Sequence, residues 1–306
     1  MHKCRGLQEP TGEEGIQQTT QTIQELQQWV YDKGYNYTVA ENWVTRLSHE
    51  DRKALCGYKP LKAPKEPPYK NVKFVSDVPK AKAETKKLGA APSSYDAMAL
   101  GYVTPVKNQG ACGSCWIFGA TADFESDVLI NESQYSNLTL NFSEQEVGDC
   151  NIWSSVGGYN FCNGGNELMT ANYFTKHGSA NESCHLYAAA SQTCLNCPIH
   201  KNVDNWRMIT GSNGDDLGQV NTIKNAILNY GPVYSTIYSG GPFGSYYDGV
   251  YEYWGPEGVN HAIEIIGWDD SLSHSHGTGA WMIKNSWGTG WGAGHKYPGC
   301  AWVAYG

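Results

Sequence analysis

Long apolar runs are absent from this chain of 306 residues. No stretch approaches the roughly 18 consecutive apolar residues of a membrane-spanning helix, so we expect no membrane span. Charged residues are also scarce, at 17%, whereas Gly, Tyr and Trp are abundant, with 35, 20 and 11 residues. Because 40% of the residues are hydrophobic, the chain can still build a sizeable core. This composition favours a loop-rich secreted fold over a helical bundle or a disordered chain.

The first residues, Met1–Gly6, lack the apolar core of a signal peptide. We therefore expect that a signal has been removed or that the sequence begins inside the natural gene product. Ten cysteines favour an oxidising compartment. Asn-x-Ser/Thr sequons point the same way and are glycosylation candidates, at Asn36, Asn131, Asn137, Asn141 and Asn181. Together these features predict a secreted or lysosomal/vacuolar protein.

A basic excess is confined to the first part of the chain. Residues 1–90 carry 15 Lys and Arg against 11 Asp and Glu (net +4), whereas the remainder carries 7 against 19 (net −12). The acidic remainder argues against nucleic acid as a partner, because phosphates would be repelled. Two segments of opposite charge suggest that one docks on the other.

The first 90 residues also differ in pattern from the rest. Apolar spacing predicts an amphipathic helix over residues 16–31, and alternation predicts a short strand over residues 35–39. Residues 59–90 contain five prolines and nine lysines, which predicts an extended linker accessible to proteases. The composition changes near residues 88–92, so we expect a domain boundary between residues 1–90 and 91–306.

The larger part of the chain divides into a helical half and a strand-rich half. Helix signals follow Cys115, Ser143 and Glu167, and short β-rich runs occupy residues 233–238, 262–266 and 280–283. This order predicts an α+β fold of two lobes, with a site at their interface.

Cys115 stands at the mouth of the first of these helices. No proline interrupts the chain between Cys115 and Pro198, and Phe118, Ala122 and Leu129 follow at helical spacing. The free N–H groups and the dipole of a helix N-terminus stabilise negative charge, so this position favours a thiolate.

Attack of a thiolate on a peptide carbonyl needs three further groups. A base must become the acid for the departing amine, another group must orient that base, and donors must hold the oxyanion. The sequence offers His261 at the start of a strand, Asn285 at the end of another, and Gln109 with the Cys115 backbone N–H. These residues are the candidate catalytic set.

Seven sequence blocks resemble the papain/cathepsin family of cysteine peptidases, in family order across residues 92–306. The blocks are Val103–Gln109, Cys112–Trp116, Ser143–Gln145, Cys162–Gly165, Gly231–Val233, Asn260–Ala262 and Lys284–Gly288. The resemblance is to a zymogen. It implies a papain-like two-lobe fold with a helical left lobe, a β-barrel-like right lobe and an active-site cleft between them, plus a small, mainly helical propeptide.

The same resemblance implies roles for individual residues. Cys115 would be the nucleophile, His261 the acid–base, Asn285 its orienter and Gln109 an oxyanion donor, forming a thioester acyl-enzyme. Trp287 would cover the Asn285–His261 hydrogen bond. The implied substrate-binding residues are the backbone strip Gly164 and Gly165, with Asn166, Glu167, Thr236 and Ala262 around the pocket for the substrate residue two before the cut.

The resemblance also implies disulfides and a mode of regulation. The implied pairs are Cys112–Cys162, Cys150–Cys194 and, as in cathepsin X-like relatives, Cys184–Cys197; the pairing of Cys4, Cys56 and Cys300 stays open. The resemblance to the family's propeptide is limited to residues 37–42 and 47–50. From the opposite charges we expect residues 1–90 to act as an intramolecular inhibitor that loosens as carboxylates protonate at acidic pH, with processing near residues 88–91. No cofactor or metal is implied, and we expect a monomer acting on peptides or proteins.

Alternative interpretations remain at three points. Cys112-Gly-Ser-Cys115 is also the C-x-x-C of thioredoxin-like redox pairs, and Cys194, Cys197 and His200 have partial zinc-site spacing. An exopeptidase of the cathepsin X type and a catalytically dead, peptidase-like binding protein are the alternative functions. An endopeptidase is favoured because no paired-histidine segment lies between Cys150 and Cys162.

Overall fold

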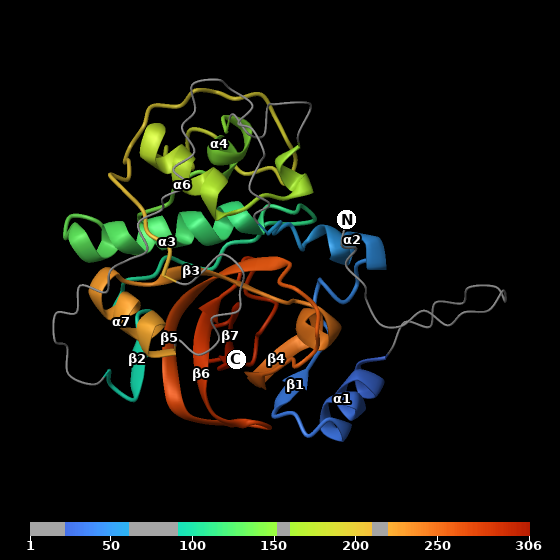
Figure 1. Ribbon diagram of the computed structural model, residues 1–306. Helices are drawn as coiled ribbons and strands as arrows, with labels where there is room; N and C mark the ends of the chain where they lie inside the picture. Colours follow the sequence, from blue (N-terminus) through green and yellow to red (C-terminus); the bar gives the residue numbers. More distant parts are fainter. Residues whose placement is uncertain (1–21, 61–90, 152–159, 210–219) are drawn as a thin grey trace.

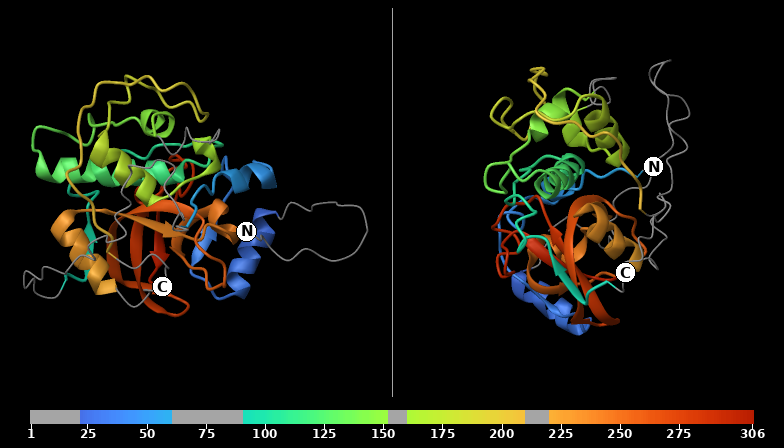
Figure 2. Two further views of the ribbon diagram at one scale, coloured as in Figure 1. Left: turned by 45° about the horizontal axis from the view of Figure 1, so that its top comes forward. Right: turned by 90° about the vertical axis from the view of Figure 1, so that its left-hand side faces the viewer.

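The computed structural model describes residues 22–60, 91–151, 160–209 and 220–306. Two lobes pack against each other, with a long buried helix between them (Figures 1 and 2). Their arrangement is the α+β two-lobe fold that the sequence predicts. Within the described residues, no helix combines the length and apolar character needed to cross a bilayer.

The helical lobe is built around α3 (Cys115–Asn131), which lies below α4 (Glu144–Asp149) and α6 (Glu167–Lys176) in Figure 1. Thirteen of the 17 residues of α3 are buried, so this helix is covered on most sides. Ser143 and Asn166 begin the two shorter helices, because their side chains accept the N–H groups of Glu146 and Met169. Their apolar faces share one core with α3, which includes Trp116, Phe124, Phe142, Phe161 and Phe174.

The second lobe is a curled seven-stranded sheet in the order β1-β4-β7-β6-β5-β2, with β3 also pairing with β5. Helix α7 (Val220–Tyr230) precedes the sheet strands of the second half. The strands are β1 (Tyr37–Val39), β2 (Ser94–Asp96), β3 (Val233–Ile237), β4 (Tyr246–Tyr251), β5 (His261–His274), β6 (Gly277–Lys284) and β7 (Cys300–Ala304). Strands β5 and β6 are buried at the ends that carry His261 and Lys284, so the residues next to them are held firmly.

The N-terminal segment packs on the sheet lobe and then passes between the lobes. Helix α1 (Ile23–Asp32) starts with a capping box at Thr22 and lies against the sheet lobe, and β1 pairs with β4 at the sheet edge (Figure 1). Val30, Val44 and Leu55 join the apolar core of that lobe. Helix α2 (His49–Ala54), started by Ser48, leads into the interface between the lobes. The predicted linker lies outside the described residues from position 61 onward.

A network of buried charged side chains connects the two lobes. Lys107 Nζ contacts Glu125 Oε1 at 2.8 Å and Glu144 Oε1 at 2.7 Å. Thr104 Oγ1 donates to Glu125 at 2.5 Å and accepts from Lys284 Nζ at 2.9 Å, on the other lobe. Burial raises the pKa of Glu144 to about 7, although Lys107 opposes this shift. Each of these buried carboxylates has a cationic partner, which offsets part of the cost of burial.

Replacement of Lys107 by methionine is expected to lower the free energy of unfolding by about 3 kcal/mol, since it leaves two buried carboxyl groups unpaired. Lys296→Met is the matched control, because Lys296 pairs with Asp96 on the surface with 51% of its side chain exposed. We expect that control to cost less than about 1 kcal/mol. Denaturant unfolding of both variants checks this, and equal losses would contradict the role assigned to Lys107.

Candidate active site

Cys115 is the first residue of α3, and its side chain is fully buried. Ser114 does not cap the helix with its side chain, because its hydroxyl pairs with the Tyr187 hydroxyl at 2.6 Å. The Cys115 sulfur instead accepts hydrogen bonds from the backbone N–H groups of Ala262, Gly57 and Trp116. The thiol thus lies where helix α3 meets the start of β5.

His261 begins β5 and lies next to Asn285, which follows β6. Its Nε2 atom is 2.8 Å from Asn285 Oδ1. The Trp287 ring covers the imidazole, with ring centroids 4.7 Å apart, and is itself buried. An amide that holds one ring nitrogen under an aromatic cover fixes the ring orientation, which is what an orienting group must do.

Gln109 is fixed on both sides of its amide. Its Oε1 accepts from Ser286 Oγ at 2.6 Å, so the Nε2 group is directed towards the site. Nε2 donates to Cys112 O at 2.6 Å and to Leu55 O at 3.0 Å. A carbonyl oxygen of the N-terminal segment therefore occupies the donor that would hold an oxyanion.

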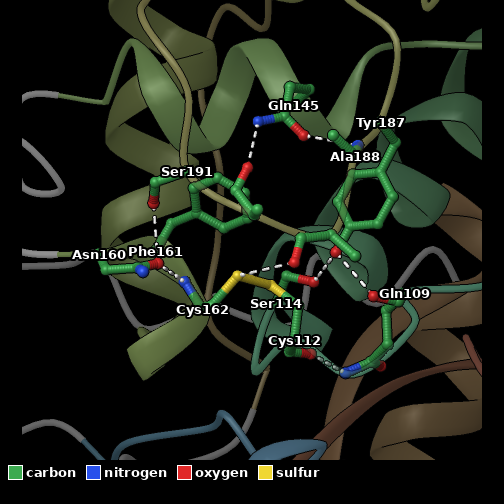
Figure 3. Close-up of a disulfide and its surroundings, with 12 residues drawn as sticks. Gln109, Cys112, Ser114, Gln145, Asn160, Phe161, Cys162, Tyr187, Ala188 and Ser191 are labelled. Atoms are coloured by element: carbon green, nitrogen blue, oxygen red, sulfur yellow. Dashed lines mark hydrogen bonds between the residues drawn. A yellow bond between two sulfur atoms is a disulfide. The ribbon is translucent and has the colours of Figure 1, made fainter.

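A disulfide holds the loop before α3 in place. Cys112 is joined to Cys162, and Figure 3 shows this bond next to Gln109 and Ser114. The Tyr187 hydroxyl bridges Ser114 and the backbone oxygen of Gln109, to which it donates at 2.8 Å. These contacts give the candidate nucleophile and the candidate oxyanion donor a common rigid support.

The backbone of Gly57–Lys59 runs along the glycine strip. Gly165 N–H donates to Gly57 O at 2.9 Å, and Lys59 N–H donates to Gly165 O at 2.8 Å. On the other side, Tyr58 N–H donates to Asn260 O at 3.1 Å. A Cβ atom on Gly164 would lie 2.1 Å from Gly57 O, so the approach requires glycine there.

The Tyr58 side chain fills the predicted substrate pocket and packs with Cys115, Ala262, Tyr234 and Val259. Of the four predicted pocket residues, Ala262 and Glu167 face Tyr58. The Asn166 side chain caps α6 instead, and Thr236 is half-buried opposite Ala262 in the β3–β5 pair. The structure therefore places two of the four predicted pocket residues, Ala262 and Glu167, next to the Tyr58 side chain.

The chain that carries these residues matches a known family. The profile described as "Papain family cysteine protease" matches residues 91–297. This chain belongs to the papain family of cysteine proteases.

Individual relatives agree with that membership. Over 205 residues the chain is 33% identical to the cathepsin L-like proteinase of Fasciola hepatica, covering 66% of this chain and 58% of that protein. Over 211 residues it is 34% identical to vignain of Vigna mungo, covering 68% and 54%. The chain thus spans little more than half the length of these relatives.

A solved zymogen shares the fold. The digestive procathepsin L2 proteinase of the Tenebrio molitor larval midgut superposes with a TM-score of 0.66 at 29% identity. The match covers 91% of this chain and 82% of that one. The likeness therefore extends beyond the region that matches the family profile.

Burial changes the pKa values of Cys115 and His261, the candidate nucleophile and acid–base. It raises the pKa of the Cys115 thiol to about 12, against the opposing backbone hydrogen bonds. Burial also lowers the pKa of His261 to about 4, and the oxygens of Asn285 and Leu55 oppose that shift. Both groups are therefore neutral at pH 7 in the covered site, which disfavours transfer of the thiol proton to the imidazole there.

The remaining cysteines settle two alternatives from the sequence. The structure pairs Cys150 with Cys194 and Cys184 with Cys197, so neither Cys194 nor Cys197 is a thiolate for zinc. These pairs, with Cys112–Cys162, are those that the family resemblance implies, and they also exclude the Cys112–Cys115 redox pair. Cys300 is buried with a free thiol, and Cys4 lies outside the described residues.

One feature of the site was not predicted from the sequence. It is the passage of Leu55–Lys59 through the cleft, since the linker was expected to begin at Lys59. Glu167, one of the predicted pocket residues, points inward, with its Oε2 atom buried. Only the short glycine-containing stretch at Gly57 could have indicated a close backbone approach, and a single glycine is a weak signal.

Proposed function

We propose that this chain is a cysteine endopeptidase made as an autoinhibited zymogen. The observation that carries the proposal is the fixed set of Cys115, His261 with Asn285 at 2.8 Å, and Gln109, whose amide already binds a carbonyl oxygen at 3.0 Å. Residues 1–90 form the inhibitory propeptide in this proposal, and residues 91–306 form the peptidase domain.

In the uncovered site, loss of burial lets the proton pass from Cys115 to His261. The Cys115 sulfur attacks the substrate carbonyl carbon, and Gln109 Nε2 with the Cys115 backbone N–H stabilises the negative oxygen. His261 then gives its proton to the departing amine, leaving a thioester. Water, deprotonated by His261, releases the acid and restores the thiol.

Passage of an internal chain segment supports an endopeptidase over a cathepsin X-like exopeptidase. Residues on both sides of Gly57 contact the site, through Leu55 O at Gln109 and Lys59 N–H at Gly165. A cleft that holds such a segment accepts a chain extending in both directions. A catalytically dead binding protein is disfavoured because Cys115 and His261 are both present.

A thiol-directed epoxide tests the proposal. Acid-processed protein is expected to be labelled at Cys115, as identified by peptide mass spectrometry, and to hydrolyse peptides. Absence of labelling in fully processed wild-type protein would contradict the enzymatic role.

We also propose that acid opens the zymogen, with processing near residues 88–91. Glu252 lies buried at the interface between the N-terminal segment and the sheet lobe. Its Oε1 atom accepts a hydrogen bond from the Asn36 N–H at 3.4 Å. Burial opposes ionisation of Glu252, yet hydrogen bonds from Ser275 and Trp254 lower its pKa below the ordinary value. A carboxylate with a depressed pKa contributes stability at neutral pH that is lost as pH falls through that pKa.

Incubation of the zymogen at pH values from 7 to 4 is therefore expected to accelerate cleavage near residues 88–91 at the acid end of this range, because a pKa lowered from 4.5 keeps Glu252 ionised above about pH 4.5. N-terminal sequencing of the products over time checks the site and the rate. A rate independent of pH would contradict acid release.

The proposed setting is a secretory or lysosomal/vacuolar route, with the protein acting as a monomer. Four sequon asparagines are exposed in the structure and Asn137 is half-buried; the exposed ones are Asn36, Asn131, Asn141 and Asn181. This exposure is compatible with glycosylation.

A further inference from the structure

The pocket beside Cys115 already holds a side chain in the zymogen. Tyr58 is only 9% exposed, and its ring packs with Ala262, Tyr234 and Val259. Its backbone is paired with Gly165 and Asn260, which are the strip and the opposite wall of the cleft. The contacts of Tyr58 therefore indicate which kinds of side chain this pocket can bind when an extended peptide lies in the cleft.

Two buried polar atoms at this pocket have no hydrogen-bond partner in the part of the chain that the structure describes. Glu167, the first residue of α6, accepts a hydrogen bond from the Tyr58 hydroxyl. Among the described residues, its Oε2 atom and the Tyr234 hydroxyl are nevertheless buried without hydrogen-bond partners. Buried polar atoms of this kind are rare in folded proteins, because each one loses its bonds to water without replacement. In the zymogen the Tyr58 side chain supplies a single hydroxyl donor to this pocket.

A side chain with several donors and a positive charge would satisfy the pocket better. A guanidinium carries five N–H donors in a planar fork, and it can reach both carboxylate oxygens and a phenol oxygen at once. An ammonium offers three donors, a tyrosine one and a phenylalanine none. The positive charge also offsets the cost of burying the Glu167 carboxylate.

We propose that this pocket selects a cationic side chain, arginine or lysine, at the substrate residue two before the cut, and that Glu167 is the specificity-determining residue. The inference rests on the proposed peptidase function and adds the class of substrate. Ala262 and Val259 form the apolar walls along the stem of that side chain, while Glu167 and Tyr234 bind its tip.

The selection should depend on pH. Burial raises the pKa of Glu167 above its ordinary value, against its own backbone N–H and the Tyr58 hydroxyl. The titratable groups that interact with it are Tyr58 of the N-terminal segment and Tyr234 of β3, and neither is a cation. This raised pKa belongs to the zymogen, in which Tyr58 covers the carboxyl group. In the processed enzyme the carboxyl group still gains its charge as pH rises past its own pKa, and the preference for arginine strengthens with it.

The test compares fluorogenic peptides that differ only at this position, carrying Arg, Tyr or Phe, with processed enzyme at several pH values. We expect kcat/KM for Arg to exceed that for Phe by about tenfold or more, and the Arg/Phe ratio to rise with pH. Glu167→Gln should lower that ratio by about tenfold and remove its pH dependence. Tyr234→Phe should lower the ratio less.

Asp248→Asn is the matched control, because it removes one negative charge from an exposed residue of β4 and should leave the ratio unchanged. Titration of Cys115 with the epoxide gives the amount of active enzyme, so a folding defect changes that amount and not the ratio. A wild-type preference for Phe or Tyr, or a ratio unaltered in Glu167→Gln, would overturn the inference while the peptidase function stands. If wild type neither takes up the epoxide nor cleaves any peptide, the proposed function fails and the inference falls with it.

Discussion

Replacement of Cys115 by alanine is expected to lower kcat/KM for peptide hydrolysis by about 10⁴-fold or more in the processed enzyme. The physical reason is that no other side chain at the site can form the thioester. His261, Asn285 and Gln109 remain in place, so the substrate still binds and the oxyanion donors are still present. The measured loss should therefore appear in kcat, with KM for the same peptide changed far less.

The chain offers a matched control in Cys300, the other buried free thiol in the described part of the chain. Cys300→Ala removes a sulfur of the same burial from the core around Val103, Ile266 and Met282. We expect it to keep full epoxide labelling at Cys115 and nearly full activity. Retained hydrolysis in Cys115→Ala, or a comparable loss in Cys300→Ala, would refute the role of Cys115 as the nucleophile.

Replacement of Gly57 by alanine is expected to open the zymogen before any processing. A Cβ atom on Gly57 would lie 1.7 Å from the Gly113 carbonyl oxygen, far inside van der Waals contact with rigid backbone. The segment must shift away, which weakens the Leu55–Gln109 and Gly57–Gly165 hydrogen bonds together. Overpacking of this kind costs roughly 1–3 kcal/mol, which corresponds to an increase of about 5- to 150-fold in the open fraction.

The rate of epoxide labelling of unprocessed zymogen at pH 7 measures that open fraction directly, because Cys115 is fully buried in the closed form. Lys53→Ala is the control, since Lys53 is exposed on α2, just before residues 55–59, which pass through the cleft. It should label at the wild-type rate. If Gly57→Ala also labels at that rate, residues 55–59 do not close the site.

Local patterns in the sequence predicted most elements of the fold. The capping side chain of Ser143 starts α4 as expected, because a cap acts within three residues of its own position. The amphipathic pattern over residues 16–31 corresponds to α1, which the structure describes from Ile23 onward. Alternating or continuous apolar runs likewise correspond to β3, β5 and β6.

The candidate catalytic set was also predictable from the sequence. Each of its residues lies in a short sequence block, and the blocks follow one another in the order found in the papain family. The sequence by itself therefore determined the family, the two-lobe fold and the identity of Cys115, His261, Asn285 and Gln109 as candidates. These conclusions depend on residue types at fixed positions, which are visible without coordinates.

Only the tertiary structure decided what covers the site and what the pocket can recognise. Two contacts close the site: Gly57 packs against Gly113, and Leu55 O accepts a hydrogen bond from Gln109. Each contact joins residues more than 50 positions apart, and no local sequence pattern encodes it. Whether Glu167 faces solvent or Tyr58 depends in the same way on how α6 packs against the cleft. The physical reason is burial. Removing water from the thiol, the imidazole and the Glu167 carboxyl changes their protonation and their hydrogen-bonding needs, and burial exists only in the folded chain.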